Sequence, residues 1–114
     1  MKTIKERYLI YSKDLNYRYT KKDVKRHNAA MDKLAKLFHL LKEESDRSFL
    51  LELLQSADEP MRCLVAAHCL GLEVYIPEAK AVLVWVAQNS KSPEMAFEAQ
   101  CTLDVWEKQG YLTF

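Results

Sequence analysis

Two groups of side chains in this sequence could do chemistry, and the first is a histidine with a carboxylate. His39 and Glu43 are four residues apart, which places both on one face of a helix, as an acid–base pair or as two metal ligands. A catalytic or metal site needs at least one further group, and no nucleophile or third ligand follows at a matching spacing. We therefore interpret them as a surface pair, assign no catalytic residue and expect no enzyme activity.

The second group consists of cysteines and a histidine. His68 precedes Cys69, and Cys63 and Cys101 complete a set in which no two cysteines have the CxxC spacing of a metal site. We expect no metal and no cofactor. The cysteines are interpreted as small apolar core residues of a protein in the reducing cytoplasm.

The N-terminal third mixes cations with aromatic rings, which is the composition of a nucleic-acid surface. Cations attract phosphates and tyrosine rings stack on bases. No glycine-rich loop or DNA-binding motif accompanies them, and Tyr8 and Tyr11 fall on an apolar stripe that we expect to face inward. The residues concerned are Arg7, Tyr8, Tyr11, Lys13, Tyr17, Arg18, Tyr19, Lys21, Lys22, Lys25 and Arg26.

Charge is distributed unevenly over the 114 residues. Residues 1–36 carry a net charge of +7 and residues 37–114 a net charge of −6, although the whole chain has +1. Such a split suggests a charged partner for one region, with an attraction between the two regions, or two simply solvated faces, as the alternatives. No apolar run is long enough to cross a membrane, and the N-terminus lacks the pattern of a signal peptide, so we expect no membrane partner.

These side chains must be positioned by helices, because the second half of the chain repeats itself after 33 residues. Residues 49–70 align without a gap onto residues 82–103, and five positions are identical. In both copies a proline follows a short polar turn, so each copy reads helix, turn, helix. The identical pairs are Leu50 and Leu83, Gln55 and Gln88, Pro60 and Pro93, Ala66 and Ala99, and Leu70 and Leu103.

The pattern predicts an all-α chain of about six helices in a single domain spanning residues 1–114. Two N-terminal helices, over residues 3–18 and from about Thr20 to Glu44, precede repeat units at about 46–71 and 77–109. The second helix has a stripe of Val24, Met31, Leu34, Phe38 and Leu41, completed by His27 or Asn28.

Capping residues set the expected bounds of the later helices. Ser45 or Asp46 would cap the third helix, Asp58 the fourth, which should stop at Gly71, and Ser92 the sixth, which should stop near Gly110. Pro77 should open the fifth helix. Its segment AVLVWVA is apolar on every side, so we expect that helix to be the buried centre and Trp85, like Trp106, to belong to the core.

The segment ADEPMRCLVAAHCLG resembles the second helix of HEAT-type repeats. The matching residues are Asp58, Pro60, Met61, Arg62, Ala66, Ala67 and Leu70. With the closing Ala99, Leu103 and Trp106, residues 20–109 are similar to a family of small bacterial HEAT-like domains of unknown function. The resemblance implies short stacked helical hairpins closed into one domain. The second copy departs from the pattern, with Lys91 at the position of Asp58 and Met95 at that of Arg62, so a ladder of Asp and Arg between repeats is not expected.

The sixth helix carries the surface that we expect to bind a partner. At 100° per residue, Ala96, Ala99, Leu103 and Trp106 fall on one arc, while Glu94, Phe97, Glu98, Cys101 and Asp104 fall on the other. An aromatic ring among carboxylates suits a basic protein. The alternative is that Phe97 packs under the C-terminal tail or against the fourth helix.

The function expected from these features is protein binding. Small bacterial domains of this build are similar to immunity proteins of contact-dependent growth inhibition and other polymorphic toxin systems, which would make the partner a toxin, and nuclease toxins are basic. The alternative function is a nucleic-acid-binding HEAT-like repeat that uses the basic N-terminal third.

Overall fold

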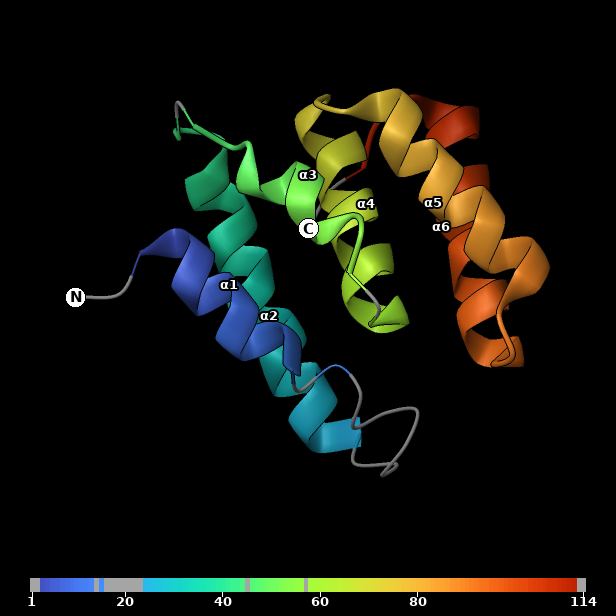
Figure 1. The fold of residues 1–114 in the computed structure, drawn as a ribbon, viewed down its shortest axis with the longest axis horizontal. Coiled ribbons are helices and arrows are strands. Elements are labelled where there is room, and N and C mark those ends of the chain that lie inside the picture. The colour runs from blue at the N-terminus through green and yellow to red at the C-terminus, as the bar shows by residue number, and fades with distance from the viewer. Residues whose placement is uncertain (1–2, 14, 16–23, 45, 57, 113–114) are drawn as a thin grey trace. The chain divides into compact units, whose positions relative to one another are not determined.

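The computed structural model describes residues 3–13, 15, 24–44, 46–56 and 58–112, and within them the chain is all-α. The helices are α1 (Ile4–Ser12), α2 (Val24–Leu41), α3 (Phe49–Leu53), α4 (Glu59–Leu72), α5 (Ile76–Asn89) and α6 (Pro93–Gln109) (Figure 1). The described residues form six helices and no strand, as the sequence predicts. They belong to two units, an N-terminal unit that reaches to Phe49 and a C-terminal unit over residues 50–113.

In the N-terminal unit, α1 packs on α2. Thr3 caps α1 by accepting the Glu6 N–H at 3.1 Å, and the Glu6 carboxylate accepts the Thr3 N–H, which completes a capping box. The helix ends at Ser12, short of the predicted residue 18. Residues 14 and 16–18 lie outside the described part of the chain, as do Thr20, the predicted cap of the second helix, and the Ser45 alternative for the third.

The core of the N-terminal unit follows the predicted stripe with two exceptions, Val24 and the half-buried Met31. Tyr8 is fully buried with its ring edge-on to Phe49, and Leu34, Phe38 and Leu41 are buried on α2. The sequence predicted that either His27 or Asn28 would face inward, and it is His27 that is buried. Its Nδ1 lies 3.1 Å from the Leu15 carbonyl oxygen. Val24 was placed wrongly, because it is 55% exposed in the first turn of α2.

In the C-terminal unit, α5 packs against both α4 and α6, and α4 also contacts α6. Asp58 caps α4 by accepting the Met61 N–H at 3.2 Å, as predicted. Gly71, by contrast, does not stop the helix. The chain leaves α4 at Glu73, which adopts the left-handed conformation with φ 59°, and its N–H reaches the carbonyl oxygens of Cys69 and Leu70.

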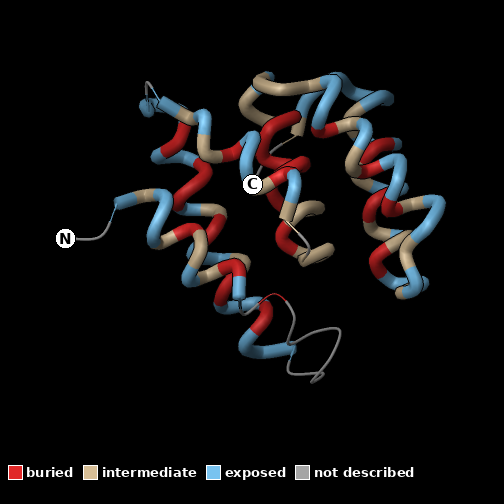
Figure 2. Tube along the Cα trace, in the orientation of Figure 1, coloured by how far each residue is buried: buried red, intermediate tan, exposed pale blue. Residues whose placement is uncertain are grey.

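The buried centre of this unit is α4, and the prediction that α5 would be the centre is wrong. Every residue of α4 from Leu64 to Leu70 is buried, whereas α5 buries only Ala79, Leu83 and Val86 (Figure 2). Val84 and Trp85 are 41% and 49% exposed. Although α5 has apolar residues on every side, other helices do not cover every side, because two of its large apolar side chains are exposed to solvent.

Candidate functional site

The candidate site lies on α6, a helix whose ends are fixed by local signals. Ser92 accepts the Met95 N–H at 3.3 Å, and Pro93 occupies the first turn, where its missing N–H leaves no bond unmade. At the other end Gly110 takes φ 79°, and its N–H donates to the Trp106 carbonyl oxygen at 2.7 Å. These caps are the predicted ones, so the phase of the side chains around α6 is set by its sequence.

One side of α6 faces the core and the other faces solvent. Met95, Ala99 and Leu103 are buried at 4%, 1% and 5% exposure. We call the opposite side the outer α6 face; its residues, all exposed, are Glu94, Phe97, Cys101, Asp104 and Val105. Because Glu94, Phe97, Cys101 and Asp104 follow one another at intervals of three or four, and Val105 lies four residues after Cys101, they form a ridge along the helix.

Phe97 is the most exposed large apolar side chain in the part of the chain that the structure describes. Its exposure of 71% excludes packing under the tail or against α4. Val105 adds a second apolar group at 44% exposure. A phenyl ring left this far in water is a ready source of binding energy, because covering it fully would contribute roughly 1.5–3 kcal/mol.

Of the four residues predicted to bind a partner, the structure brings three onto this face. Glu94 and Asp104 lie on either side of Phe97 along the helix, and both are exposed. Glu98 is half-buried and turned toward α4, where its charge is among the causes that raise the pKa of Cys63. Glu98 therefore belongs to the edge of the face.

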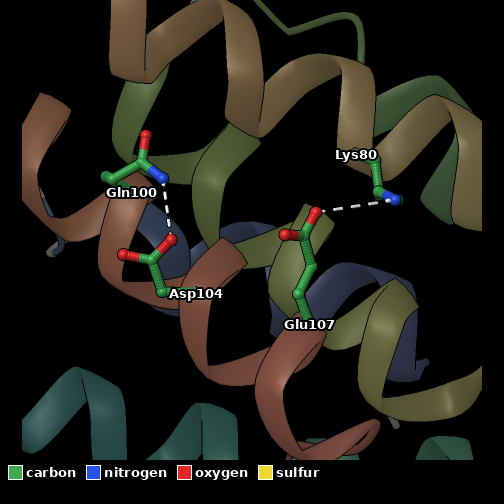
Figure 3. A network of polar contacts seen from close by, with 4 residues as sticks. All are labelled: Lys80, Gln100, Asp104 and Glu107. Carbon is green, nitrogen blue, oxygen red and sulfur yellow. Dashed lines mark hydrogen bonds and ion pairs between the residues drawn. The ribbon is translucent and has the colours of Figure 1, made fainter.

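The carboxylates of α6 differ in how they are compensated (Figure 3). Glu107 lies 3.8 Å from the Lys80 ammonium of α5, and Asp104 accepts a hydrogen bond of 2.9 Å from the Gln100 amide. Among the described residues no cation pairs with Glu94 or Asp104. The outer α6 face thus keeps its negative charge, which is the charge expected of a surface that attracts a basic partner.

A second pair of residues was missed by the sequence reasoning. Trp85 was expected in the core, but it is 49% exposed, and the Arg62 guanidinium of α4 lies 5.3 Å from the centre of its ring. The repeat contained a signal for this, since Trp85 aligns with Glu52, which is exposed on α3. The prediction placed Trp85 in the core because its side chain is apolar, although the aligned position in the first repeat copy is exposed.

The cysteines and histidines do not converge on a site. Cys69 is buried and Cys63 half-buried, but Cys101 is exposed, which corrects its assignment to the core. Burial raises the pKa of Cys63 and of Cys69 to about 12, and the charges of Glu59 and Glu78, respectively, add to that rise. Burial also lowers the pKa of His68 to about 3. Within the described residues no three His, Cys, Asp or Glu side chains gather as metal ligands do.

His39 and Glu43 do not both lie on α2. Because α2 ends at Leu41, Glu43 lies beyond the helix, in a turn where its N–H donates to the Leu40 carbonyl oxygen at 3.1 Å. The two side chains therefore do not share a helical face as predicted.

The exposed side of α2 carries four cations, Lys25, Arg26, Lys33 and Lys36. Lys33 lies over the half-buried Tyr11 ring at 5.2 Å, and residues 16–23 lie outside the described part.

Comparisons of the chain with protein-family models, with curated proteins and with solved structures give no significant match. Among the described helices, none combines the length and the apolar character that a membrane span requires.

Proposed function

We propose that this chain is a protein-binding module whose outer α6 face docks onto a basic protein. The observation that carries the proposal is the 71% exposure of Phe97 between Glu94 and Asp104, two carboxylates that no cation of the described residues pairs with. Protein interfaces concentrate their binding energy in an aromatic residue that becomes fully covered, and flanking charges speed the encounter with an oppositely charged partner.

The repeat supports a HEAT-like arrangement of the helices around this face. Three of the five identical pairs are buried in both copies: Leu50 with Leu83, Ala66 with Ala99, and Leu70 with Leu103. The second copy differs on its outer side, since Phe97 aligns with the buried Leu64, and Cys101 with the buried His68. We infer that two helical hairpins share one core pattern, and that the second hairpin has an additional role at its surface.

The partner that fits this surface is a toxin domain, and the chain would act as its immunity protein. Enzymes that cleave nucleic acids bind phosphates through cations, so an acidic face with an aromatic anchor can occupy the same groove and exclude the substrate. Residues 50–113 carry nine carboxylates and four cations, which favours such a partner. This function would be exercised in the cytoplasm without catalysis or cofactor.

Co-expression with the toxin domain encoded beside this gene tests the proposal. The wild-type chain should restore growth and inhibit the purified toxin, whereas the Phe97→Ser variant should lose at least about tenfold in affinity, as expected for an interface hot spot. Ile10→Ser, which removes a 40% exposed apolar side chain of α1, is the matched control and should bind normally. Absence of a toxin gene nearby, together with absence of a tight protein partner, would refute the immunity function.

The same purified chain distinguishes the alternative function. A nucleic-acid-binding protein would bind DNA or RNA with an affinity that falls steeply with salt and that is lost when Lys21, Lys22, Lys25 and Arg26 are neutralised. Binding of that kind, unaffected by Phe97→Ser, would replace the proposal.

A further inference from the structure

The exposed side of α5 differs from those of α2 and α6, because it carries very little charge. The two ionisable residues of this helix with a charge at neutral pH are Glu78, in its first turn, and Lys80. The Lys80 ammonium lies 3.8 Å from the Glu107 carboxylate of α6 and is compensated there. From Ala81 to Asn89 the helix has no charged side chain. Two copies of this chain can therefore approach through α5 without the repulsion that α2, with four exposed cations, or the outer α6 face would cause.

Four exposed residues of α5 follow one another at intervals of three, four and three. They are Glu78, Ala81, Trp85 and Gln88, and we call them the α5 seam. This spacing is that of the a and d positions along which two helices pack in a coiled coil. The buried residues of α5 belong to its other side, where α4 and α6 pack. The α5 seam is thus free to meet a second helix.

Trp85 is the largest side chain of the α5 seam, and its ring is held in place from one side. The Arg62 guanidinium of α4 lies 5.3 Å from the ring centre, while 49% of Trp85 stays exposed. Covering the rest of the indole would remove apolar surface from water. Because the ring already packs on one side, ordering it in an interface costs less entropy than ordering a mobile side chain would.

The α5 seam is complementary to itself when two copies run antiparallel about a two-fold axis near Leu83. That position is midway between Ala81 and Trp85 and also midway between Glu78 and Gln88. Each Trp85 then faces Ala81 of the second copy, a large side chain over a small one. Each Glu78 faces Gln88 of the second copy, whose amide donates to the carboxylate. A parallel pair would instead set Trp85 against Trp85 and place the two Glu78 carboxylates together, which is unfavourable.

We propose that this chain self-associates through the α5 seam as an antiparallel two-fold pair. The α5 seam includes no residue of the outer α6 face, so the pair goes beyond the proposed function and does not depend on it. With 14 residues, α5 is about 21 Å long. A single pair of such helices covers less than the roughly 1,200 Å² of a stable interface, so the association is weak. The chain is then mostly monomeric at about 10 µM and largely dimeric at about 1 mM.

Sedimentation equilibrium of the full chain over this concentration range tests the pairing, and NMR locates it. The average mass should rise from that of a monomer toward that of a dimer. The indole N–H signal of Trp85 should shift with concentration, and that of the half-buried Trp106 on α6 should stay in place. A chain that remains monomeric at about 1 mM, or a dimer that leaves the Trp85 signal unchanged, would overturn the proposal.

Substitutions in the α5 seam should change the association in opposite directions. Ala81→Glu sets a carboxylate against the indole of the second copy and should weaken pairing at least about tenfold. The matched control is Ala29→Glu on the exposed side of α2, which should pair like the wild type. Gln88→Lys should strengthen pairing and Gln88→Glu weaken it, by about two- to fivefold each, because this position faces Glu78 twice across the axis.

Circular dichroism reports whether each variant is folded. If Ala81→Glu fails to fold, the opposite effects of the two Gln88 substitutions decide, and effects of equal sign would overturn the assignment to the α5 seam.

Disulfide formation between two variants tests the antiparallel arrangement. Both carry Cys101→Ser, which removes the exposed native thiol and leaves the half-buried Cys63 and the buried Cys69. An equal mixture of Glu78→Cys and Gln88→Cys chains, oxidised at about 1 mM, should form the mixed disulfide in preference to both self-linked products, because only facing positions come within bonding distance. A preference for either self-linked product, or no preference, would overturn the proposal.

Discussion

Leu64 on α4 and Phe97 on α6 occupy the same position of the 33-residue repeat, yet Leu64 is 7% exposed and Phe97 71%. A nearby pair of equivalent positions is buried in both copies, since Ala66 is 0% exposed and Ala99 1%. The two copies of the repeat thus share buried positions and differ outside them.

This pair gives the first prediction, which concerns stability. Leu64→Ala should lower the free energy of unfolding by about 2–4 kcal/mol, because it opens a cavity in the core. Phe97→Ala should change it by less than about 0.5 kcal/mol, as is usual for a surface substitution. Urea denaturation followed by circular dichroism measures both. A loss of similar size for the two variants would mean that Phe97 is covered in solution.

The three thiols should differ in reactivity. Cys101 is exposed, whereas Cys63 is half-buried and Cys69 is buried. Burial raises the pKa of both Cys63 and Cys69 to about 12. At about pH 8 a thiol with that pKa is ionised in roughly one molecule in ten thousand, and the thiolate is the nucleophile. Mass spectrometry after brief exposure to a maleimide should find Cys101 modified first, and all three cysteines modified in urea.

The same reagent maps the proposed interface. Cys101 lies on the outer α6 face one turn from Phe97, so a bound partner should protect it. Unchanged labelling of Cys101 in a saturated complex would place the interface elsewhere.

The buried His68 should make stability depend on pH. Its pKa is lowered from 6.5 to about 3 by burial, so the unfolded chain binds a proton between these values and the folded chain does not. Stability is therefore fully present above pH 6.5 and falls with acidification until about pH 3, by about 2 kcal/mol between pH 6.5 and about pH 5. The His68→Leu variant should lack this contribution to the change of the free energy of unfolding with pH, however much the substitution alters stability at pH 7. An unaltered slope in that variant would show that other groups cause the pH dependence.

The end of α4 offers a stabilising substitution. Glu73 holds φ 59° and ψ 38°, a conformation that is strained for residues with a Cβ and open to glycine. Glu73→Gly should stabilise the fold by up to about 1 kcal/mol, and Glu73→Val should destabilise it, because β-branched residues fit this conformation poorly. Thermal unfolding of both variants beside the wild type provides the measurement, and a lower midpoint for the glycine variant would contradict the assigned cap.

The ion pair between Lys80 and Glu107 should contribute little. The two side chains are 38% and 59% exposed, and their charges are 3.8 Å apart. A double-mutant cycle with Lys80→Met and Glu107→Gln should give a coupling below about 1 kcal/mol that weakens with salt. Lys80 also lies over the Trp106 ring at 5.2 Å, so Lys80→Met, which keeps an unbranched stem of similar length, removes the charge while preserving part of that packing.

Features that depend on a few neighbouring residues could be predicted from the amino-acid sequence. Asp58 and Ser92 cap α4 and α6, and Gly110 ends α6, because each forms its bond within one turn of the chain. Because the sequence sets the first residue of α6, it also sets the direction in which each side chain of that helix projects, including the outward direction of Phe97. Gly71 failed as a stop signal because a hydrogen-bonded turn at Glu73 allows one more residue of helix.

The number of neighbours around each helix depends on how the helices pack, and it could not be predicted from the sequence. A run such as AVLVWVA is apolar on all sides, but burial requires other elements to cover those sides, and no local signal gives their number. Hence α4 is buried on all sides from Leu64 to Leu70, while α5, which is also apolar on all sides, leaves Trp85 half exposed. The pairing of that ring with Arg62 joins residues on different helices, and only the packing of α4 against α5 brings them together.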